Sequence, residues 1–278
     1  MRLGVHIRIA GGLVKALDRA QYLGCEAIQL FSGNPNGWAR TLLPLDVANK
    51  FRARTAGLDI HPVILHTPYL LNLASPDDVI WIKSKGALVD AVEKAPMLEA
   101  GYIVTHIGSH KGSGYKVGVK RIANAVRFAL EADPNPIIAL ELGAGAGNSI
   151  GSRFEHIADI MEHLPDVTDR VGICIDTAHL WGSGYDISTE GGVSDMFDEL
   201  DRYVGLERLK VVHLNDTQKD LASHADRHYH IGHGQVGLEG FRAILHHPAT
   251  RDLPGIIETP DDIEWDKRNL KTLHSLQE

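Results

Sequence analysis

Six segments of this chain that are typical of β-strands each end in a side chain that binds divalent metals. The segments are HPVILH, YIVTH, IIALE, GICID, KVVH and GIIE, and they close on His66, His106, Glu141, Asp176, His213 and Glu258. Imidazole and carboxylate groups together are the ligands of zinc-type sites. If the fold brings the six ends together, the chain carries the ligands of a metal-dependent reaction.

Three further candidate ligands are expected in loops. His179 follows Asp176 by three residues in DTAH, and Asp226 and His228 form a D-R-H pair after the segment that ends in His213. One catalytic zinc usually takes three protein ligands and a water, so nine ligands exceed the needs of one ion. We expect two or three ions, with a carboxylate such as Glu141 bridging a pair. A single strand-end histidine is more often a hydrogen-bonded core residue, but six such groups together would be costly to bury without cations.

The elements that must position these residues alternate regularly between strand-like and helix-like patterns. We expect strands at 3–7, 26–31, 61–66, 102–106, 137–141, 171–176, 209–214 and 254–258. Eight strand–helix units predict an α/β fold of the (β/α)8 TIM barrel type, as a single domain over residues 1–278, which brings all strand C-termini to one mouth. An open doubly wound sheet also gathers strand ends at one edge, but no glycine-rich phosphate loop follows the first strand, which favours the barrel.

Strand parity and helix signals give two independent checks of this fold. The residues two positions before the six strand-end ligands are all apolar, and with a period of two they share the ligands' face. They predict a dry layer beneath the metals, formed by Ile64, Val104, Ala139, Cys174, Val211 and Ile256. Ser75 and Ser152 are expected to cap helix N-termini, and Gly24 and Gly101 are each expected to end a helix.

Composition and charge limit the class of protein. With 44% hydrophobic residues the chain can bury a sizeable core, and its two cysteines, Cys25 and Cys174, lie in apolar runs that favour buried thiols. No segment reaches the length of a membrane span, so we expect a soluble, cytoplasmic protein with no membrane partner. The formal charge of −8 does not exclude DNA, because three divalent cations would bring it to about −2.

The chain resembles the endonuclease IV family of metal-dependent enzymes that incise DNA at abasic sites. The resemblance is carried by GVHIRIAGG, FSGNPNGW, HTPYLLNLASP, THIGSHKGSG, LELGAGAG, GICIDTAHLWGSGYD, HLNDT, DRHYHIGHGQVG and IIETP, which span nearly the whole chain. It implies hydrolysis of the phosphodiester bond 5′ to an abasic site in double-stranded DNA, leaving a 3′-hydroxyl. A monomer is expected. An abasic nucleotide is cheap to extrude because it has no base to unstack.

The resemblance also implies a ligand set for three zinc ions, although manganese or iron also suits such sites in part. By position, His66, His106 and Glu141 would hold the first ion. Glu141, Asp176, His213 and Glu258 would hold the second, and His179, Asp226 and His228 the third. Glu141 and Glu258 are the residues expected to be catalytic.

The residues expected to contact DNA depart from the family pattern more than the ligands do. Tyr69 and Leu70 match the family's DNA-penetrating loop, although both residues could equally pack beneath that loop. His110 and Trp38 are further candidate DNA contacts. The positions that differ from the usual pattern, and that bear on the range of substrates, are Arg8, Asn36, Leu142, Gly143, Gln218 and Ala222.

Two other functions remain open from the sequence. A metal-dependent sugar isomerase or epimerase can share this barrel and a site of histidines and carboxylates, but would use one or two metals in a small closed pocket. A DNA-binding or metal-holding barrel without activity is the other alternative. The separate DTAH and DRH residues, together with the PYLLNL and FSGNPNGW loops, favour a phosphate substrate.

Overall fold

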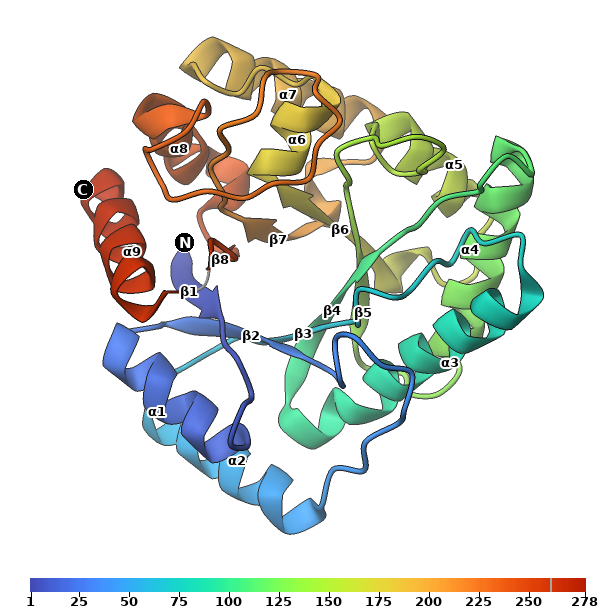
Figure 1. The fold of residues 1–278 in the computed structure, drawn as a ribbon, viewed down its shortest axis with the longest axis horizontal. Helices are drawn as coiled ribbons and strands as arrows, with labels where there is room; N and C mark the ends of the chain where they lie inside the picture. Colours follow the sequence, from blue (N-terminus) through green and yellow to red (C-terminus); the bar gives the residue numbers. More distant parts are fainter. Residues whose placement is uncertain (261) are drawn as a thin grey trace.

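Eight parallel strands form a closed barrel in the computed structural model, which describes residues 1–260 and 262–278 (Figure 1). Each strand pairs with the next one along the chain, and the last pairs with the first. The strands are β1 Arg2–His6, β2 Ala27–Phe31, β3 Val63–His66, β4 Ala100–His106, β5 Ile137–Glu141, β6 Val171–Asp176, β7 Leu209–His213 and β8 Pro254–Ile257. The predicted TIM barrel is therefore confirmed.

Helices surround the barrel and connect its strands (Figure 1). The α-helices are α1 Leu13–Leu23, α2 Leu45–Gly57, α3 Asp78–Lys94, α4 Tyr115–Leu130, α5 Phe154–Glu162, α6 Thr177–Ser183, α7 Glu190–Tyr203, α8 Gly237–His246 and α9 Ile263–Gln277. Short 3-10 turns lie at Pro96–Leu98, Thr168–Arg170, Leu206–Arg208 and Pro248–Thr250. Within the described part of the chain, no helix is long and apolar enough to cross a membrane.

The helix boundaries agree with the sequence signals only in part. Gly24 ends α1 in the left-handed conformation at φ 74°, as predicted. The predicted helix end at Gly101 is wrong, because Gly101 lies in β4. Asp77, and not Ser75, caps α3, because its carboxylate accepts from the amides of Val79 and Ile80. The Ser75 hydroxyl instead accepts from the Asp77 amide. The predicted cap at Ser152 is also wrong, since Arg153 occupies the N-cap of α5 without a side-chain hydrogen bond.

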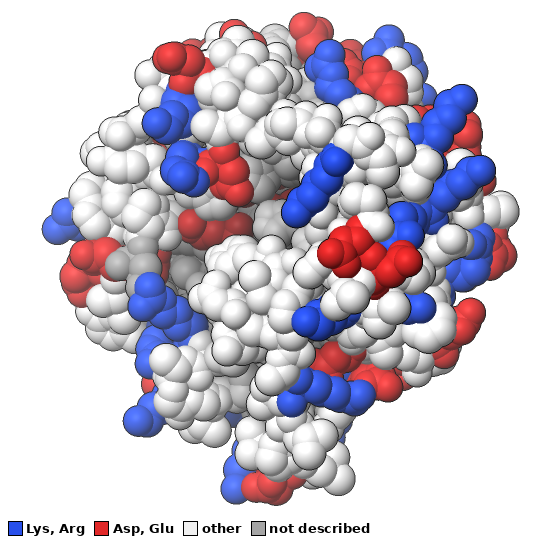
Figure 2. Space-filling model, turned by 45° about the vertical axis from the view of Figure 1, so that its right-hand side comes forward, with Lys and Arg blue, Asp and Glu red and all other residues white. Residues whose placement is uncertain are grey.

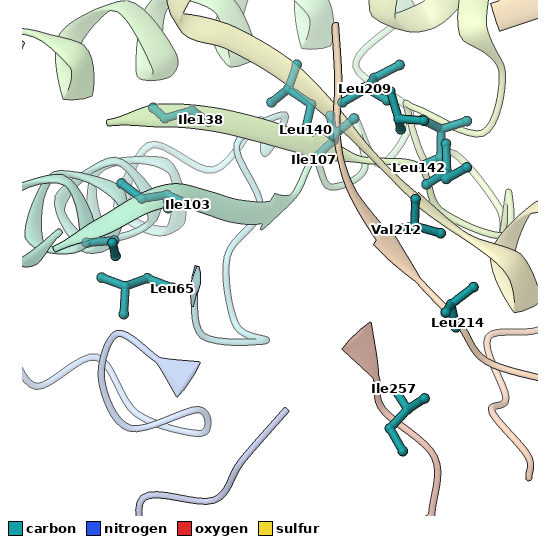
Figure 3. Close-up of a cluster of buried hydrophobic side chains, with 14 of the residues drawn as sticks. Leu65, Ile103, Ile107, Ile138, Leu140, Leu142, Leu209, Val212, Leu214 and Ile257 are labelled. Carbon is teal, nitrogen blue, oxygen red and sulfur yellow. The ribbon is translucent and has the colours of Figure 1, made fainter. Parts of the chain in front are cut away.

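The apolar core has an inner and an outer part, one on each face of the sheet. The inner part contains all six residues predicted to form the dry layer, together with Ala27 of β2. The outer part packs the strands against the helices, and Figure 3 shows Leu65, Ile103, Leu140 and other side chains of this cluster. The two-residue period thus leaves the next inward position of each strand for the polar residues at the mouth.

The strand register brings several of these polar residues side by side. His106 is paired with Glu141 across β4 and β5, and Asp176 with His213 across β6 and β7. Glu258 lies one residue beyond the end of β8. The barrel therefore collects the six strand-end candidates at one mouth.

Candidate metal centre

Eight of the nine sequence-predicted ligands fall into three overlapping groups of possible ligand atoms, all within 4.8 Å of one another in each group. The first group contains His66, His106 and Glu141. The central group contains Glu141, Asp176, His213 and Glu258, and the third contains Asp176, His179 and His228. Two carboxylates, those of Glu141 and Asp176, belong to two groups each, so the three groups are contiguous.

The first group is built on the side chain of Glu141. Its Oε2 lies 3.1 Å from His66 Nε2 and 3.4 Å from His106 Nδ1. Strands β3, β4 and β5 are consecutive in the barrel and supply the three residues. Glu141 and His66 are buried, whereas the side chain of His106 is 27% exposed.

The central group surrounds His213 Nδ1. This nitrogen lies 3.1 Å from Glu258 Oε2, 3.4 Å from Glu141 Oε1 and 3.8 Å from Asp176 Oδ2. The side chains of His213, Asp176 and Glu141 are at most 1% exposed. Three carboxylates around one buried imidazole form a donor set with net negative charge, which suits a divalent cation.

The third group lies at the start of α6 and in the loop after β7. Asp226 is the one predicted ligand outside the three groups, although its Oδ1 is 3.2 Å from His179 Nε2 and 3.5 Å from His228 Nε2. Asp226 is the most exposed candidate ligand at 59%. His228 Nε2 is also 3.5 Å from Asp176 Oδ2, so Asp176 reaches this group as well as the central one.

Backbone carbonyls fix the orientation of three of the histidines. The Nδ1 atoms of His66, His179 and His228 lie 2.6, 2.8 and 3.0 Å from the carbonyl oxygens of Thr67, Leu142 and Glu258. A carbonyl accepts only, so each Nδ1 carries a proton and, in the neutral ring, each Nε2 keeps a free lone pair. All three Nε2 atoms face the carboxylate of a predicted ligand, namely Glu141, Asp226 or Asp176.

Unpartnered buried atoms test whether these residues suit a metal. Four atoms that face the groups have no hydrogen-bond partner in the described structure: Glu141 Oε1, His179 Nε2, His213 Nδ1 and His228 Nε2. A buried polar atom without a partner typically costs about 1–3 kcal/mol. Divalent cations would satisfy all four atoms, so the donor set fits metal ions.

The pKa values of the candidate ligands also reflect the close approach of carboxylates and histidines. Burial raises the pKa of Glu141 and Glu258, but neighbouring histidines outweigh burial and hold both pKa values well below the usual range. Burial lowers the pKa of His179, but Asp176 and Asp226 outweigh it and raise that pKa to about 10. The ionised carboxylates thus stabilise positive charge beside them. In the absence of metal ions, a protonated histidine such as His179 provides that charge.

A cavity of about 260 Å³ opens over the groups. Its lining includes His106, Asp226, Tyr69 and the exposed guanidinium of Arg227. Tyr69 is 58% exposed and Leu70 is 37% exposed, so neither side chain is packed beneath its loop. The Tyr69 ring leans on Phe31 with 4.9 Å between ring centroids, which places it at the rim of the cavity.

The two other predicted DNA contacts lie outside this cavity lining. His110 organises its own turn, because its Nδ1 accepts from the amides of Gly112 and Gly114. Trp38 is half-buried beside Lys83, whose ammonium lies 5.9 Å from the ring centroid, and it lines a separate cavity of about 340 Å³. The structure therefore groups only Tyr69 of the candidate DNA contacts with the metal ligands.

The positions that depart from the family pattern have different local roles. Leu142 keeps the hydrogen bonding of the site intact, since its backbone carbonyl accepts from His179. Ala222 adopts φ 58°, a left-handed conformation that favours glycine over alanine. Arg8, Asn36 and Gln218 are exposed.

Sequence reasoning missed two buried amides that contact the ligands. Gln29 of β2 contacts Glu258 and His213, and Asn215 donates to Asp176 Oδ2 at 2.7 Å and accepts from the Glu258 amide. Strand parity could have found Gln29, because it lies two residues beyond Ala27 on the inward face of the same strand. Asn215 lies outside a strand, so no such signal existed for it.

Comparisons with known proteins give a consistent family. Residues 17–277 match the family model described as xylose isomerase-like TIM barrel. A protein named probable endonuclease 4 from Chloroflexus aurantiacus is 43% identical, with 99% of this chain and 98% of that protein covered. A protein with the same name from Methanoculleus marisnigri is 42% identical, with the same coverage.

Solved structures extend the comparison to the fold. The crystal structure of endonuclease IV from Thermus thermophilus has a TM-score of 0.88 and 34% identity, covering 99% of this chain and 98% of that chain. A D-tagatose 3-epimerase-like protein has a TM-score of 0.73 at 16% identity, covering 100% of this chain and 98% of that one. The second likeness extends to the barrel alone.

Proposed function

The chain belongs to the xylose isomerase-like TIM barrel family and, within it, to endonuclease IV, and we propose that it incises double-stranded DNA at abasic sites. The bond cleaved is the phosphodiester 5′ to the abasic deoxyribose. Water attacks the phosphorus, the bond to the upstream 3′-oxygen breaks, and that oxygen leaves as a 3′-hydroxyl. The products are a primer end and a 5′-phosphorylated abasic sugar.

The continuity of the three ligand groups is the observation that carries this proposal. Glu141 joins the first group to the central one, and Asp176 joins the central group to the third. Phosphodiester hydrolysis places charge on the attacking water oxygen, on the leaving oxygen and on two non-bridging oxygens, so adjacent cationic positions suit it better than a single position does. We assign His66, His106 and Glu141 to the first zinc, Glu141, Asp176, His213 and Glu258 to the second, and His179, Asp226 and His228 to the third.

The residues of the chain prepare the site for this chemistry. When bound, divalent cations supply Lewis acidity toward the phosphate and lower the pKa of water. Glu141 and Glu258 stay ionised and hold the centre of the ligand set, and for this reason we assign them as the catalytic carboxylates. Arg227 offers the cavity an exposed positive charge that can pair with a phosphate oxygen.

Tyr69 and Leu70 supply the selectivity for damaged DNA in this proposal. Both are exposed at or beside the rim of the cavity, where an apolar wedge can enter a base step. An abasic nucleotide has no stacking to lose, so its extrusion toward the cavity costs less than that of an intact nucleotide. We further propose that the enzyme acts as a monomer.

Incision of an end-labelled duplex with one stable abasic analogue tests the proposal. The zinc-loaded protein should cut on the 5′ side of the analogue, leave an extendable 3′-hydroxyl, and spare the matched intact duplex. No incision by fully loaded protein would refute the nuclease proposal. Turnover of small carbohydrates by the same sample would then favour a sugar isomerase or epimerase.

A further inference from the structure

The side-chain amide of Gln29 lies against the central group, although an amide is not among the proposed ligands. Gln29 is fully buried. Its Nε2 lies 2.8 Å from Glu258 Oε1, and its Oε1 lies 2.9 Å from His213 Nε2. The side chain therefore bridges two of the four residues of the central group.

The chemistry of the two partners permits one orientation of this amide. The ionised Glu258 carboxylate can only accept, so the Gln29 NH2 group must face it. The Gln29 oxygen is then directed at His213 Nε2, which must carry a proton in order to donate. His213 Nδ1 is consequently the nitrogen left to face Glu258 Oε2, Glu141 and Asp176.

His6 completes the arrangement from the neighbouring strand. It is paired in register with Gln29 across β1 and β2, the two strands that supply no predicted ligand. Its Nδ1 lies 2.6 Å from Glu258 Oε1, the oxygen that Gln29 also contacts. Two donors on Oε1 leave Oε2 as the oxygen that faces His213 at 3.1 Å.

We propose that Gln29, assisted by His6, is a positioning residue that selects the ligand atoms of the central group. It holds the proton on His213 Nε2 and engages Glu258 Oε1, so that His213 Nδ1 and Glu258 Oε2 are the atoms presented to a cation. This inference rests on the proposed function only in taking the central group to bind a metal. It requires no particular DNA substrate.

A purely structural role would leave a different trace. If Gln29 only filled space, methionine would replace it well, because the two side chains are similar in length and shape. Methionine neither donates to Glu258 nor accepts from His213, so the imidazole could then turn or change its protonated nitrogen. Loss of a hydrogen-bond partner of a metal ligand typically weakens metal affinity about 10–100-fold.

The test compares Gln29→Met with Ile28→Val, read by metal binding in the absence of DNA. Ile28 is the adjacent residue of β2, fully buried in the outer core, so its variant perturbs the same strand without reaching the ligands. Zinc affinity is measured by competition with a chromophoric chelator, and the visible absorption of the cobalt-substituted protein reports ligand geometry. Gln29→Met should weaken one site roughly 10-fold or more and alter the cobalt spectrum.

The expected control result is a cobalt spectrum and zinc affinities for Ile28→Val that match the wild-type protein. Wild-type affinity and spectrum in Gln29→Met would overturn the proposal, even in an active nuclease. A weakened site would support it, even if the wild-type protein failed to incise abasic DNA.

A second variant keeps the test decisive if Gln29→Met does not fold. His6→Phe removes one donor to Glu258 and retains a ring against Phe31, whose centroid lies 4.2 Å away. It should weaken the same site in the same direction, and unchanged zinc affinity would overturn the proposal.

Discussion

At the scale of single residues, four of the five candidate histidine ligands have a hydrogen-bond partner that orients the ring. In His66, His179 and His228, the Nδ1–H group donates a hydrogen bond to a backbone carbonyl, while Nε2 faces the site. His213 is oriented by a side chain, Gln29, instead of by the backbone. The ligand atoms are thus selected before any metal binds, which lowers the entropy cost of binding.

Glu141→Gln should abolish incision while the barrel stays folded. The carboxylate joins two ligand groups, and an amide supplies neither its charge nor its second acceptor oxygen. We expect kcat/KM to fall by at least about 10³-fold and the number of bound zinc ions to drop. Gel-based incision assays and elemental analysis measure both, with the exposed Glu190→Gln as the control. Full activity in Glu141→Gln would remove the proposed site. His106→Ala should likewise abolish incision and lower the number of bound zinc ions while the barrel stays folded.

Tyr69→Ala should weaken the preference for abasic DNA more than it changes the metal content. The ring is 58% exposed at the cavity rim and contacts no ligand atom by hydrogen bond, so its loss leaves the three groups in place. A stacked aromatic ring is worth about 1–3 kcal/mol per base step, which corresponds to roughly 5–150-fold in binding. Binding of abasic and intact duplexes at one salt concentration measures the preference. An unchanged ratio would show that Tyr69 is not a wedge.

At the scale of elements, rigid strands supply the first and central groups, whereas the third depends on a helix start and a loop. Asp176 ends β6, caps α6 through the His179 amide, and thereby ties strand to helix. His228 lies in the loop between β7 and α8, which is tied by a bridge from Asp216 to Tyr229 and by backbone hydrogen bonds such as that from the Gln235 amide to the Thr217 carbonyl. The Asp216 side chain adds further hydrogen bonds that order this loop.

Asp216→Asn should loosen this loop. The buried Asp216 carboxylate accepts from the amides of Thr217, Gly232, Gly234 and Val236 at 2.8–3.0 Å. An asparagine turns one acceptor into a donor that faces N–H groups, which should cost about 1–3 kcal/mol of stability. Hydrogen exchange of the 229–236 amides and the amount of zinc that the protein retains measure the effect.

The matched control is Asp186→Asn. Asp186 is an exposed carboxylate in a different loop, and it accepts a hydrogen bond from the Ser188 amide. It should leave exchange in 229–236 unchanged. Equal protection of these amides in Asp216→Asn and the wild-type protein would contradict the role of Asp216.

At the scale of the whole molecule, folding and metal binding draw on different parts of the barrel. The outer core and the dry inner layer are apolar and continuous without any metal ligand. Charged side chains of both signs are interspersed over the face shown in Figure 2, with no single block of positive charge. We expect DNA binding to rely on local features of the mouth, such as Arg227 and the cations that the ligand groups would hold, because the net charge of −8 does not favour it.

Removal of metal should abolish incision, leave the secondary structure intact and lower the unfolding temperature. At a free zinc concentration about 100-fold above its Kd, each site adds about 2.7 kcal/mol to the free energy of unfolding. This raises the unfolding temperature by on the order of 5–10 °C for a protein of this size. Circular dichroism with and without a chelator measures this shift, and added zinc should restore activity. Loss of the folded barrel on chelation would show that the metals are structural. An unchanged unfolding temperature would show that the sites do not bind tightly.

The sequence by itself determined the barrel, its eight strands, the dry layer and the side chains that gather at the mouth. This was possible because a period of two fixes the face of each residue, and a parallel barrel sends every strand end to one side. Resemblance supplied the division into three ligand sets. The geometry gathers eight of the nine predicted residues into three groups, and its third group contains Asp176 where the predicted third set has Asp226.

The tertiary structure alone decided which atoms meet. Register between neighbouring strands placed Gln29 beside His6 and against Glu258, residues far apart in the chain. The fold also places Asp176 in two groups and Asn215 between Asp176 and Glu258. In the loops, Tyr69 stays exposed, whereas the His110 side chain bonds within its own turn. Such contacts depend on barrel closure and loop conformation, which no local pattern of residues encodes.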